Sequence, residues 1–337
     1  MVKNAAASWE LGTASEALLE LDNTDLSVFG HHAFTSASAE TEALAYAKPH
    51  IALGSDLLIA DAASNSDPVS LGVAAVMLGK TISAYSTAAE NQLNTLLYHT
   101  PKASNGAISH RSRSIALWSD FIYMAPPFLA YYAISTQNDT LLDVAVQQVQ
   151  DYRAVLKSSS GAWSHISASS HPDTSFWSTG NGWAAMGITR VLAAILAAPS
   201  RTTNQQTQTV TLRDWIKEII DAAMKTPRDS AGLLHNYLNN AATIGETSGT
   251  ALLAAVVYRM AVLEPTVFSS TYIAWADTSL NAIAKHVNAA GVVSPAVNPY
   301  AYTSQTPYTK GSPEGQAFAV MLYAAHRDCF AASVCSS

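Results

Sequence analysis

Residues 181–198 read NGWAAMGITRVLAAILAA, and this stretch shows the pattern that decides the fold. Apolar side chains recur in it near the helical period and not with the alternation of a strand. Alanine has the highest helix propensity, and its small side chain lets neighbouring helix axes approach closely. The segment therefore predicts a helix that is buried among other helices.

Similar apolar stretches occur on both sides of this segment, along most of the chain. Alternating segments rich in Val, Ile and Thr are scarce, so we expect no sheet of any size. Asp67-Pro68 and Ser312-Pro313 are typical helix starts, because an N-cap residue precedes a proline at the first helical position. The pattern predicts an all-α protein with helices at about 8–21, 40–60, 67–81, 83–98, 118–135, 139–157, 181–198, 208–225, 246–263, 269–287 and 313–327.

Every second predicted helix begins roughly 50 to 70 residues after the one before, with one further helix and a loop in between. That spacing is typical of αα-hairpins. An open α-solenoid is the alternative to a closed ring. We predict an (α/α)6 barrel formed by residues 1–337 as a single domain, with its inner helices starting near Trp9, Asp67, Trp118, Asn181, Glu246 and Pro313.

Charged residues make up only 13% of the chain, and the formal net charge is −7 with no cluster of Lys or Arg. Phosphate recognition needs concentrated positive charge, so a nucleic acid is not an expected partner. No apolar run approaches the roughly 20 residues needed to span a bilayer, so a membrane is not expected either. We expect a monomer.

The location of the protein has to be inferred from a few features. The first residues lack the apolar stretch of a signal peptide, so either the protein is cytosolic or a leader precedes this chain. Cys329 and Cys335 lie close enough in sequence for a local disulfide, although free thiols also fit. Asn138-Asp139-Thr140 is a glycosylation sequon. Both features favour an extracellular, secreted protein.

The most informative segment for chemistry is LWSDFIYMAPPF, residues 117–128. Asp120 is predicted in the first turn of a helix, two residues after Trp118, with Tyr123 and Met124 one turn later. Apolar walls raise the pKa of a carboxyl group and make it a usable proton donor. A purely structural role is the alternative, since the helix dipole favours an Asp at this end. Asp67 is either an N-cap or the second carboxylate of an acid pair.

A second region, residues 161–165 and 175–183, combines aromatic, glycine and polar residues. Its Trp faces suit stacking against a sugar ring, whereas a loop that packs its aromatics beneath the barrel is the alternative. His110 and His165 fit ordinary hydrogen bonding as well as ligand binding. Glu246 and Glu314 each open an apolar helix, and capping explains both. No His-x-His or paired-Cys spacing supports a metal, so we expect neither metal nor cofactor.

Together these motifs resemble glycoside hydrolase family 105, the unsaturated rhamnogalacturonyl hydrolases, and especially its fungal members. The resemblance covers nearly the whole chain and implies the six-hairpin barrel. The segments that carry it are Ser8–Thr13, Gly106–His110, Trp118–Phe128, Gly161–His165, Trp177–Trp183, Glu246–Ala251 and Ser312–Phe318.

The resemblance implies a specific chemistry. Members of the family protonate C4 of a 4,5-unsaturated uronic acid and add water at C5, after which the ring opens and the partner sugar is released. Asp120 matches the catalytic Asp of the motif Trp-x-Asp-x-(Leu/Ile)-Tyr-Met, and Asp67 matches a supporting Asp. The candidate substrate-binding residues are His110, Trp118, Tyr123, Met124, His165, Trp177, Thr179, Asn181 and Trp183.

One departure puts the sugar in doubt. Bacterial members carry Arg in Trp-x-Arg-Gly-Asn-Gly-Trp, where this chain has Thr179. Threonine cannot form the bidentate charged contact that a guanidinium makes with a uronate. We therefore predict a hydrolase of unsaturated uronyl oligosaccharides whose uronate is held by neutral donors. A hydrolase of saturated glycosides and a non-catalytic sugar-binding toroid are the alternatives.

Overall fold

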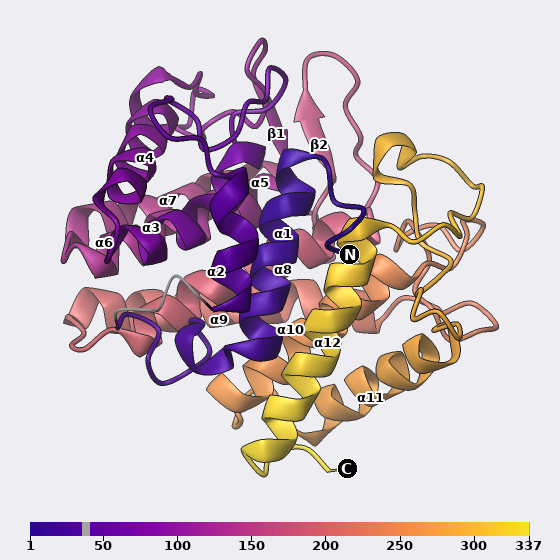
Figure 1. Ribbon diagram of the computed structural model, residues 1–337. Helices are drawn as coiled ribbons and strands as arrows, with labels where there is room; N and C mark the ends of the chain where they lie inside the picture. Colours follow the sequence, from indigo (N-terminus) through magenta and orange to yellow (C-terminus); the bar gives the residue numbers. More distant parts are fainter. Residues whose placement is uncertain (36–40, 337) are drawn as a thin grey trace.

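The computed structural model describes residues 1–35 and 41–336, and it is predominantly helical (Figure 1). A two-stranded antiparallel sheet joins β1 (Ala116–Trp118) to β2 (Ile166–Ala168). Short turns of tighter or wider helix lie at Thr24–Leu26, Lys48–His50, Asp67–Leu71, Thr95–His99 and Pro299–Ala301. The α-helices are α1 (Ser8–Asp22), α2 (Glu42–Ala47), α3 (Gly72–Gly79), α4 (Ser83–Asn94), α5 (Phe121–Met124), α6 (Pro126–Ser135), α7 (Asp139–Leu156), α8 (Ser178–Ala197), α9 (Thr203–Met224), α10 (Thr247–Leu263), α11 (Ser270–Lys285) and α12 (Pro313–Ala331).

Alternate helices form an inner ring. Along the chain α3 contacts α6, α6 contacts α8, α8 contacts α10, and α10 contacts α12. The ring closes because α12 packs against α1, and α1 packs against the turn that leads into α3. Outside this ring, α2, α4, α7, α9 and α11 each pack on the inner helix that precedes them in sequence. This is the predicted (α/α)6 barrel; in the described part of the chain no helix follows α12 to cover it in the same way.

Burial explains why the two sets of helices differ in sequence. Helix α10 is buried at every residue from Thr247 to Ala261, and α8 is buried from Ser178 to Ile195. A helix that is apolar all round must be enclosed on every side. The outer helices α7 and α9 bury one face and expose the other. Fully apolar and amphipathic helices therefore alternate along the chain because the former lie in the inner ring and the latter in the outer one.

A network of charged side chains lies inside the barrel. Glu20 on α1 accepts hydrogen bonds from Arg190 on α8 at 2.5 Å and from Arg259 on α10 at 2.9 Å. Arg259 also contacts Asp328 on α12 at 2.6 Å. Glu20 and both arginines are almost fully buried. Since buried charges are tolerated only when paired, this network joins four inner helices.

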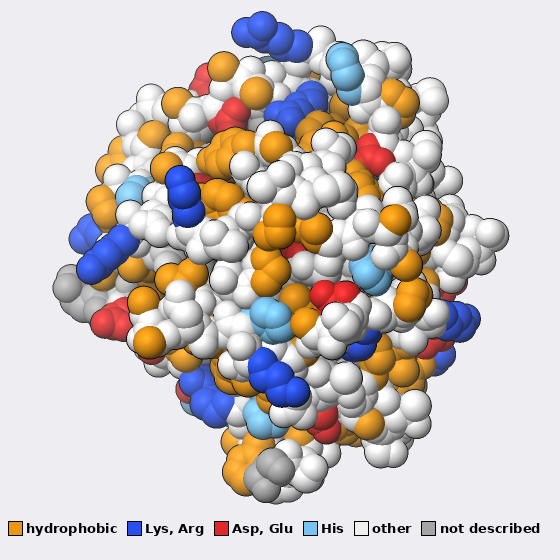
Figure 2. Space-filling model, turned by 90° about the vertical axis from the view of Figure 1, so that its right-hand side faces the viewer, with side chains coloured by type: hydrophobic (Ala, Val, Ile, Leu, Met, Phe, Trp, Pro, Cys, Tyr) orange, Lys and Arg blue, Asp and Glu red, His pale blue; other side chains and the backbone are white. Residues whose placement is uncertain are grey.

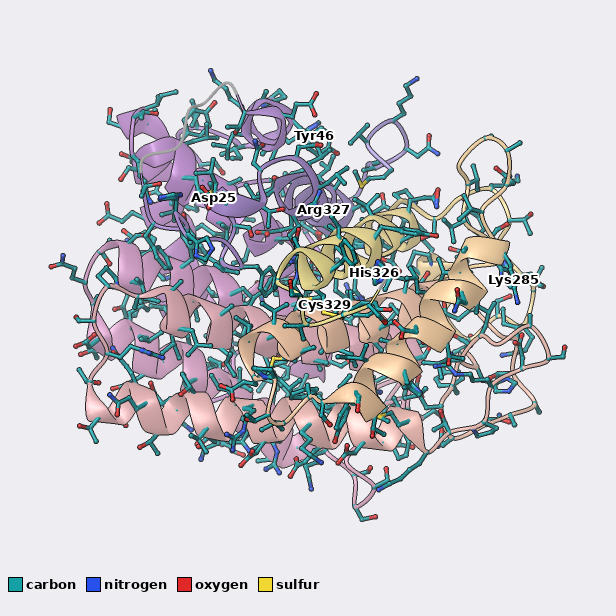
Figure 3. All side chains as sticks on the ribbon, turned by 90° about the horizontal axis from the view of Figure 1, so that it is seen from below. Asp25, Tyr46, Lys285, His326, Arg327 and Cys329 are labelled. Atoms are coloured by element: carbon teal, nitrogen blue, oxygen red, sulfur yellow. A yellow bond between two sulfur atoms is a disulfide. The ribbon has the colours of Figure 1, made fainter. Side chains whose placement is uncertain are left out.

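The two ends of the chain are fastened to each other. Arg327 on α12 donates to the carbonyl oxygens of Glu20 and Leu21 near the end of α1, at 3.0 and 2.6 Å (Figure 3). Cys329 forms a disulfide with Cys335, which ties down the segment after α12. At the other end of α12, Trp9 donates its indole N–H to Glu314 at 2.9 Å. The first and last helices therefore contact each other along their length.

Two predicted helices are partly wrong. The helix predicted at 40–60 ends at Ala47, followed by one tighter turn at Lys48–His50 and irregular backbone with Gly54 at φ +74°; residue 40 lies outside the described residues. The helix predicted at 118–135 begins only at Phe121, because Trp118 belongs to β1. It is also interrupted before Pro126-Pro127, since proline lacks the N–H that an uninterrupted helix would use.

The surface fits the low charge of the sequence. On the face shown in Figure 2, basic and acidic side chains are scattered among neutral and apolar ones and do not gather into a patch of one sign. None of the helices in the described ranges combines the length and apolar character needed to cross a bilayer.

Candidate active site

The small sheet brings two distant parts of the chain together at one end of the barrel. Trp118 pairs with Ile166 in register, and the N–H of Ser119 donates to the carbonyl of His165 at 2.9 Å. Asp120 follows directly and precedes α5. The sheet therefore sets the side chain of Asp120 beside the imidazole of His165, although the two residues are 45 positions apart.

The side chains of Asp120 and His165 lie next to each other. Nε2 of His165 lies 3.5 Å from Oδ2 of Asp120, and the hydroxyl of Ser119 donates to the same oxygen at 3.1 Å. Nδ1 of His165 lies 3.2 Å from Oδ2 of Asp173, which also accepts from the hydroxyl of Tyr237 at 2.8 Å. Burial alone lowers the pKa of His165, but the two neighbouring carboxylates raise it above the ordinary value.

The protonation state of Asp120 differs from the prediction. Burial acts to raise the pKa of Asp120, but the neighbouring imidazole of His165, whose Nε2 lies 3.5 Å away, lowers it below the ordinary value. The prediction that apolar walls raise this pKa is therefore wrong for the free protein, because an imidazole lies beside the carboxyl group. Asp120 is ionised at neutral pH.

Asp67 shows the opposite shift. It begins the turn Asp67–Leu71 that leads into α3, and its side chain is buried. Burial, followed by the negative charges of Asp61 and Asp120, raises the pKa of Asp67 to about 7. His110 lies 3.9 Å from its carboxyl and does not offset this, because burial lowers the pKa of His110 to about 3 and keeps it neutral. One carboxyl group of the site therefore carries a proton in mildly acidic solution while the other is ionised.

These groups line a pocket of about 290 Å³. The ring of Trp118 is stacked on His110 with centroids 4.9 Å apart, and His165 lies among Trp118, Trp177 and Tyr302. Aromatic walls around a few polar groups are typical of small-molecule sites. The lining consists of Trp9, Asp67, His110, Arg111, Trp118, Asp120, Met124, His165, Trp177, Trp183, Pro299, Tyr300, Tyr302 and Glu314.

Eight of the predicted site residues lie in this pocket: Asp67, His110, Trp118, Asp120, Met124, His165, Trp177 and Trp183. Tyr123 does not line it. Its ring packs against Trp183 at 4.3 Å, the guanidinium of Arg190 lies 4.5 Å from the ring centroid, and its hydroxyl points toward Met321. Tyr123 therefore belongs to the barrel interior below the pocket.

Thr179 is also placed elsewhere. It is fully buried in the first turn of α8, and its hydroxyl donates to Oε1 of Glu246 at 3.3 Å. That glutamate caps α10, because it accepts from the N–H groups of Ser248 and Gly249. The prediction that Thr179 faces the substrate is therefore wrong, since its hydroxyl is used between two inner helices.

Asn181 is likewise a structural residue. Its amide oxygen accepts from the N–H of Trp163, and its amide nitrogen donates to the carbonyls of Trp163 and Trp177, each within 2.9 Å. The side chain is fully buried and does not line the pocket. It fixes the backbone of Trp177, whose ring does line the pocket, so its effect on the site is indirect.

Several pocket residues were not among the predicted ones. Pro299, Tyr300 and Tyr302 lie before α12, in a segment whose sequence shows no helical periodicity. Arg111 follows His110 directly. Ser312 caps α12 as predicted, and Glu314 accepts from Trp9 inside the pocket. Burial raises the pKa of Glu314 well above the ordinary value. The sequence indicated Arg111 only by its position next to His110, which was a predicted site residue.

No group of three or more His, Cys, Asp or Glu side chains in the described part of the chain is arranged to hold a metal ion. The titratable and charged side chains that line the pocket include the two aspartates, the two histidines, Arg111 and Glu314.

Comparison with known proteins relates this chain to a family of glycosyl hydrolases. The model of Glycosyl Hydrolase Family 88 matches residues 39–328. No curated protein sequence matches the chain.

Among solved structures, a glycoside hydrolase from family 105 of C. acetobutylicum has a TM-score of 0.76 at 13% identity, over 97% of this chain and 95% of that one. A possible family 105 member from Salmonella enterica serovar Paratyphi A has a TM-score of 0.75 at 16% identity, over 96% and 83%. The unsaturated glucuronyl hydrolase of Bacillus sp. GL1 has a TM-score of 0.59 at 14% identity, over 78% and 74%. At these identities the likeness supports the fold.

Proposed function

This chain belongs to Glycosyl Hydrolase Family 88, and from that membership we propose that it removes a 4,5-unsaturated uronic acid from the non-reducing end of an oligosaccharide. The observation that carries the proposal is the pair of Asp67 and Asp120, whose pKa values are shifted in opposite directions within one aromatic pocket. Two carboxyl groups that differ in protonation supply an acid and a base at the same pH.

At a pH between the two pKa values, Asp67 and Asp120 together carry one proton. In the free protein that proton resides on Asp67. A bound uronate brings a further negative charge and displaces water, and both effects raise the pKa of Asp120. Asp120 is thereby protonated in the complex and gives its proton to C4 of the enol ether. The resulting carboxylate accepts a proton from the water whose oxygen bonds to C5.

The remaining steps follow from the product. The hemiketal at C5 collapses to a ketone, the ring oxygen leaves C5 as a hydroxyl on C1, and the hemiacetal formed at C1 releases the partner sugar. The names of structural neighbours support this substrate class, since they include an unsaturated glucuronyl hydrolase and an unsaturated glucuronyl hydrolase specific for heparin. We further propose that the protein is secreted, which the Cys329–Cys335 disulfide supports.

The test compares unsaturated galacturonyl and glucuronyl disaccharides, prepared with a lyase, with their saturated counterparts. We expect loss of the enol-ether ultraviolet absorbance together with release of the partner sugar from at least one unsaturated disaccharide, and no cleavage of the saturated ones. Cleavage of a saturated disaccharide would instead identify an ordinary glycosidase. Binding without any cleavage would identify a non-catalytic sugar-binding protein.

A further inference from the structure

Within the described ranges, Arg111 is the only lysine or arginine that lines the pocket. Its guanidinium carbon lies 4.1 Å from the centroid of the Trp118 ring. Among the described residues its side chain makes no hydrogen bond to a protein group and lies within 4.0 Å of no carboxylate oxygen. A guanidinium fixed against an aromatic face, with its N–H groups unused, is suited to receive an anion.

The backbone of Arg111 is held firmly. It forms a bridge with Ser64, and its carbonyl accepts from the side-chain amide of Asn65 at 2.9 Å. Its N–H donates to the hydroxyl of Ser109 at 3.2 Å. The cation is therefore positioned before a ligand arrives, which reduces the entropy lost on binding.

The acidic groups of the pocket do not neutralise Arg111. Asp120 lies beside His165, Asp67 carries a proton in mildly acidic solution, and burial raises the pKa of Glu314 well above its ordinary value. The positive charge of Arg111 also contributes to the pKa values of Asp67, His110 and Tyr302, so its field extends across the pocket. The negative charge of Asp61 also reaches Asp67 and His110, but no carboxylate of the described residues forms an ion pair with Arg111. A negatively charged ligand therefore finds a guanidinium that has no carboxylate partner.

Building on the proposed function, we propose that Arg111 binds the carboxylate of the non-reducing uronic acid while stacked on Trp118. It thereby supplies the basic group that position 179 lacks, since Thr179 is buried against Glu246. Arg111 then holds the uronate by a bidentate charged contact. The sequence had suggested neutral donors alone.

The test measures binding and turnover separately. Wild type, Arg111→Gln, Arg111→Lys and the control Arg113→Gln are titrated with a saturated galacturonyl-rhamnose disaccharide, as free acid and as methyl ester, using tryptophan fluorescence. Arg113 lies two residues along the same loop, is exposed and does not line the pocket. Circular dichroism verifies that each variant is folded.

We expect wild type to bind the acid more tightly than the ester, and Arg111→Gln to bind the acid about 10-fold to 100-fold more weakly with little change for the ester. Arg111→Lys should fall in between, and Arg113→Gln should match wild type. Salt should weaken binding of the acid to wild type but not to Arg111→Gln. Equal losses for acid and ester would show that Arg111 only supports Trp118, and unchanged binding would also overturn the proposal.

Turnover of the unsaturated disaccharide distinguishes this proposal from the one on which it rests. If wild type binds the acid through Arg111 but leaves the enol-ether absorbance unchanged, the proposed reaction fails and the role of Arg111 stands. If wild type consumes the substrate and Arg111→Gln does so with the same KM, the reaction stands and the role of Arg111 is refuted.

Discussion

Nε2 of His165 lies 3.5 Å from Oδ2 of Asp120, close enough for the imidazole to control the charge of that carboxyl group. The contact makes Asp120 a carboxylate in the free protein and leaves Asp67 as the group that retains a proton. Catalysis by Asp67 and Asp120 depends on which of the two carboxyl groups carries their shared proton.

Replacing Asp120 with Asn keeps the shape of the side chain but removes the titratable group. We expect kcat to fall by at least about 10²-fold, because no other carboxyl in the pocket takes the same position beside His165. Circular dichroism and thermal melting should be unchanged. Near-wild-type turnover on the best substrate would reject the assignment.

The pH dependence of kcat/KM should report the pair in the free enzyme. Activity should fall as pH rises through about 7, where Asp67 loses its proton. Asp67→Asn should lower activity and remove the limb near neutral pH. If kcat/KM of Asp67→Asn still decreases near neutral pH, that decrease reports the titration of a different side chain.

Introducing Arg at position 179 should not restore uronate binding. Thr179 is fully buried against Glu246, so a longer side chain has no room there, and we expect a loss of roughly 1–3 kcal/mol in the free energy of unfolding. Thr179→Val is the matched control, because it removes only the hydrogen bond. Urea unfolding and KM are the measurements. A stable Thr179→Arg variant with a lower KM would show that the side chain reaches the pocket.

The charged network inside the barrel should be important for stability. Glu20→Gln leaves Arg190 and Arg259 without their shared carboxylate, and we expect a loss of about 3–5 kcal/mol in the free energy of unfolding. Asp214→Asn, which disrupts the exposed pair of Asp214 with Arg213, should cost less than about 1 kcal/mol. Similar losses for the two variants would mean that the buried network contributes little.

Exhaustive dialysis against a chelator should leave activity intact, because the proposed hydration uses an acid, a water molecule and a positioned ring. The assay is turnover before and after treatment with EDTA. Inactivation that a divalent metal reverses would reveal a metal requirement.

The fold was largely predictable because its signals are local. Apolar periodicity identifies α8 and α10, and Ser312 caps α12 before Pro313 as predicted. The N-cap prediction for Asp67 was wrong, because Ser66 is the cap and Asp67 is the first residue of the turn. The helix predicted at 40–60 failed because apolar residues continue beyond Ala47 while the backbone does not stay helical.

The site was predictable only in part because it depends on contacts between distant segments. Asp120 and His165 belong to recognisable motifs, but the pairing of Trp118 with Ile166 that joins them is not encoded by either motif alone. Arg111 reaches the pocket through a bridge to Ser64, and Tyr302 reaches it from an irregular segment, so neither has a local signature. The prediction for Thr179 was wrong because a motif fixes where a residue lies in the sequence. It does not fix the direction in which a side chain points from the first turn of a helix.

The hydrogen bond from Trp9 to Glu314 joins residues 305 positions apart, and both line the pocket. A chain emerging from the ribosome therefore carries Trp9, Asp67 and Asp120 for most of its synthesis without the wall that α12 provides. The first helix has to remain unpartnered on that side until the last one has been translated. The pocket is therefore complete only after α12 has been translated, and a truncated chain lacking α12 would retain both aspartates without the wall that this helix provides.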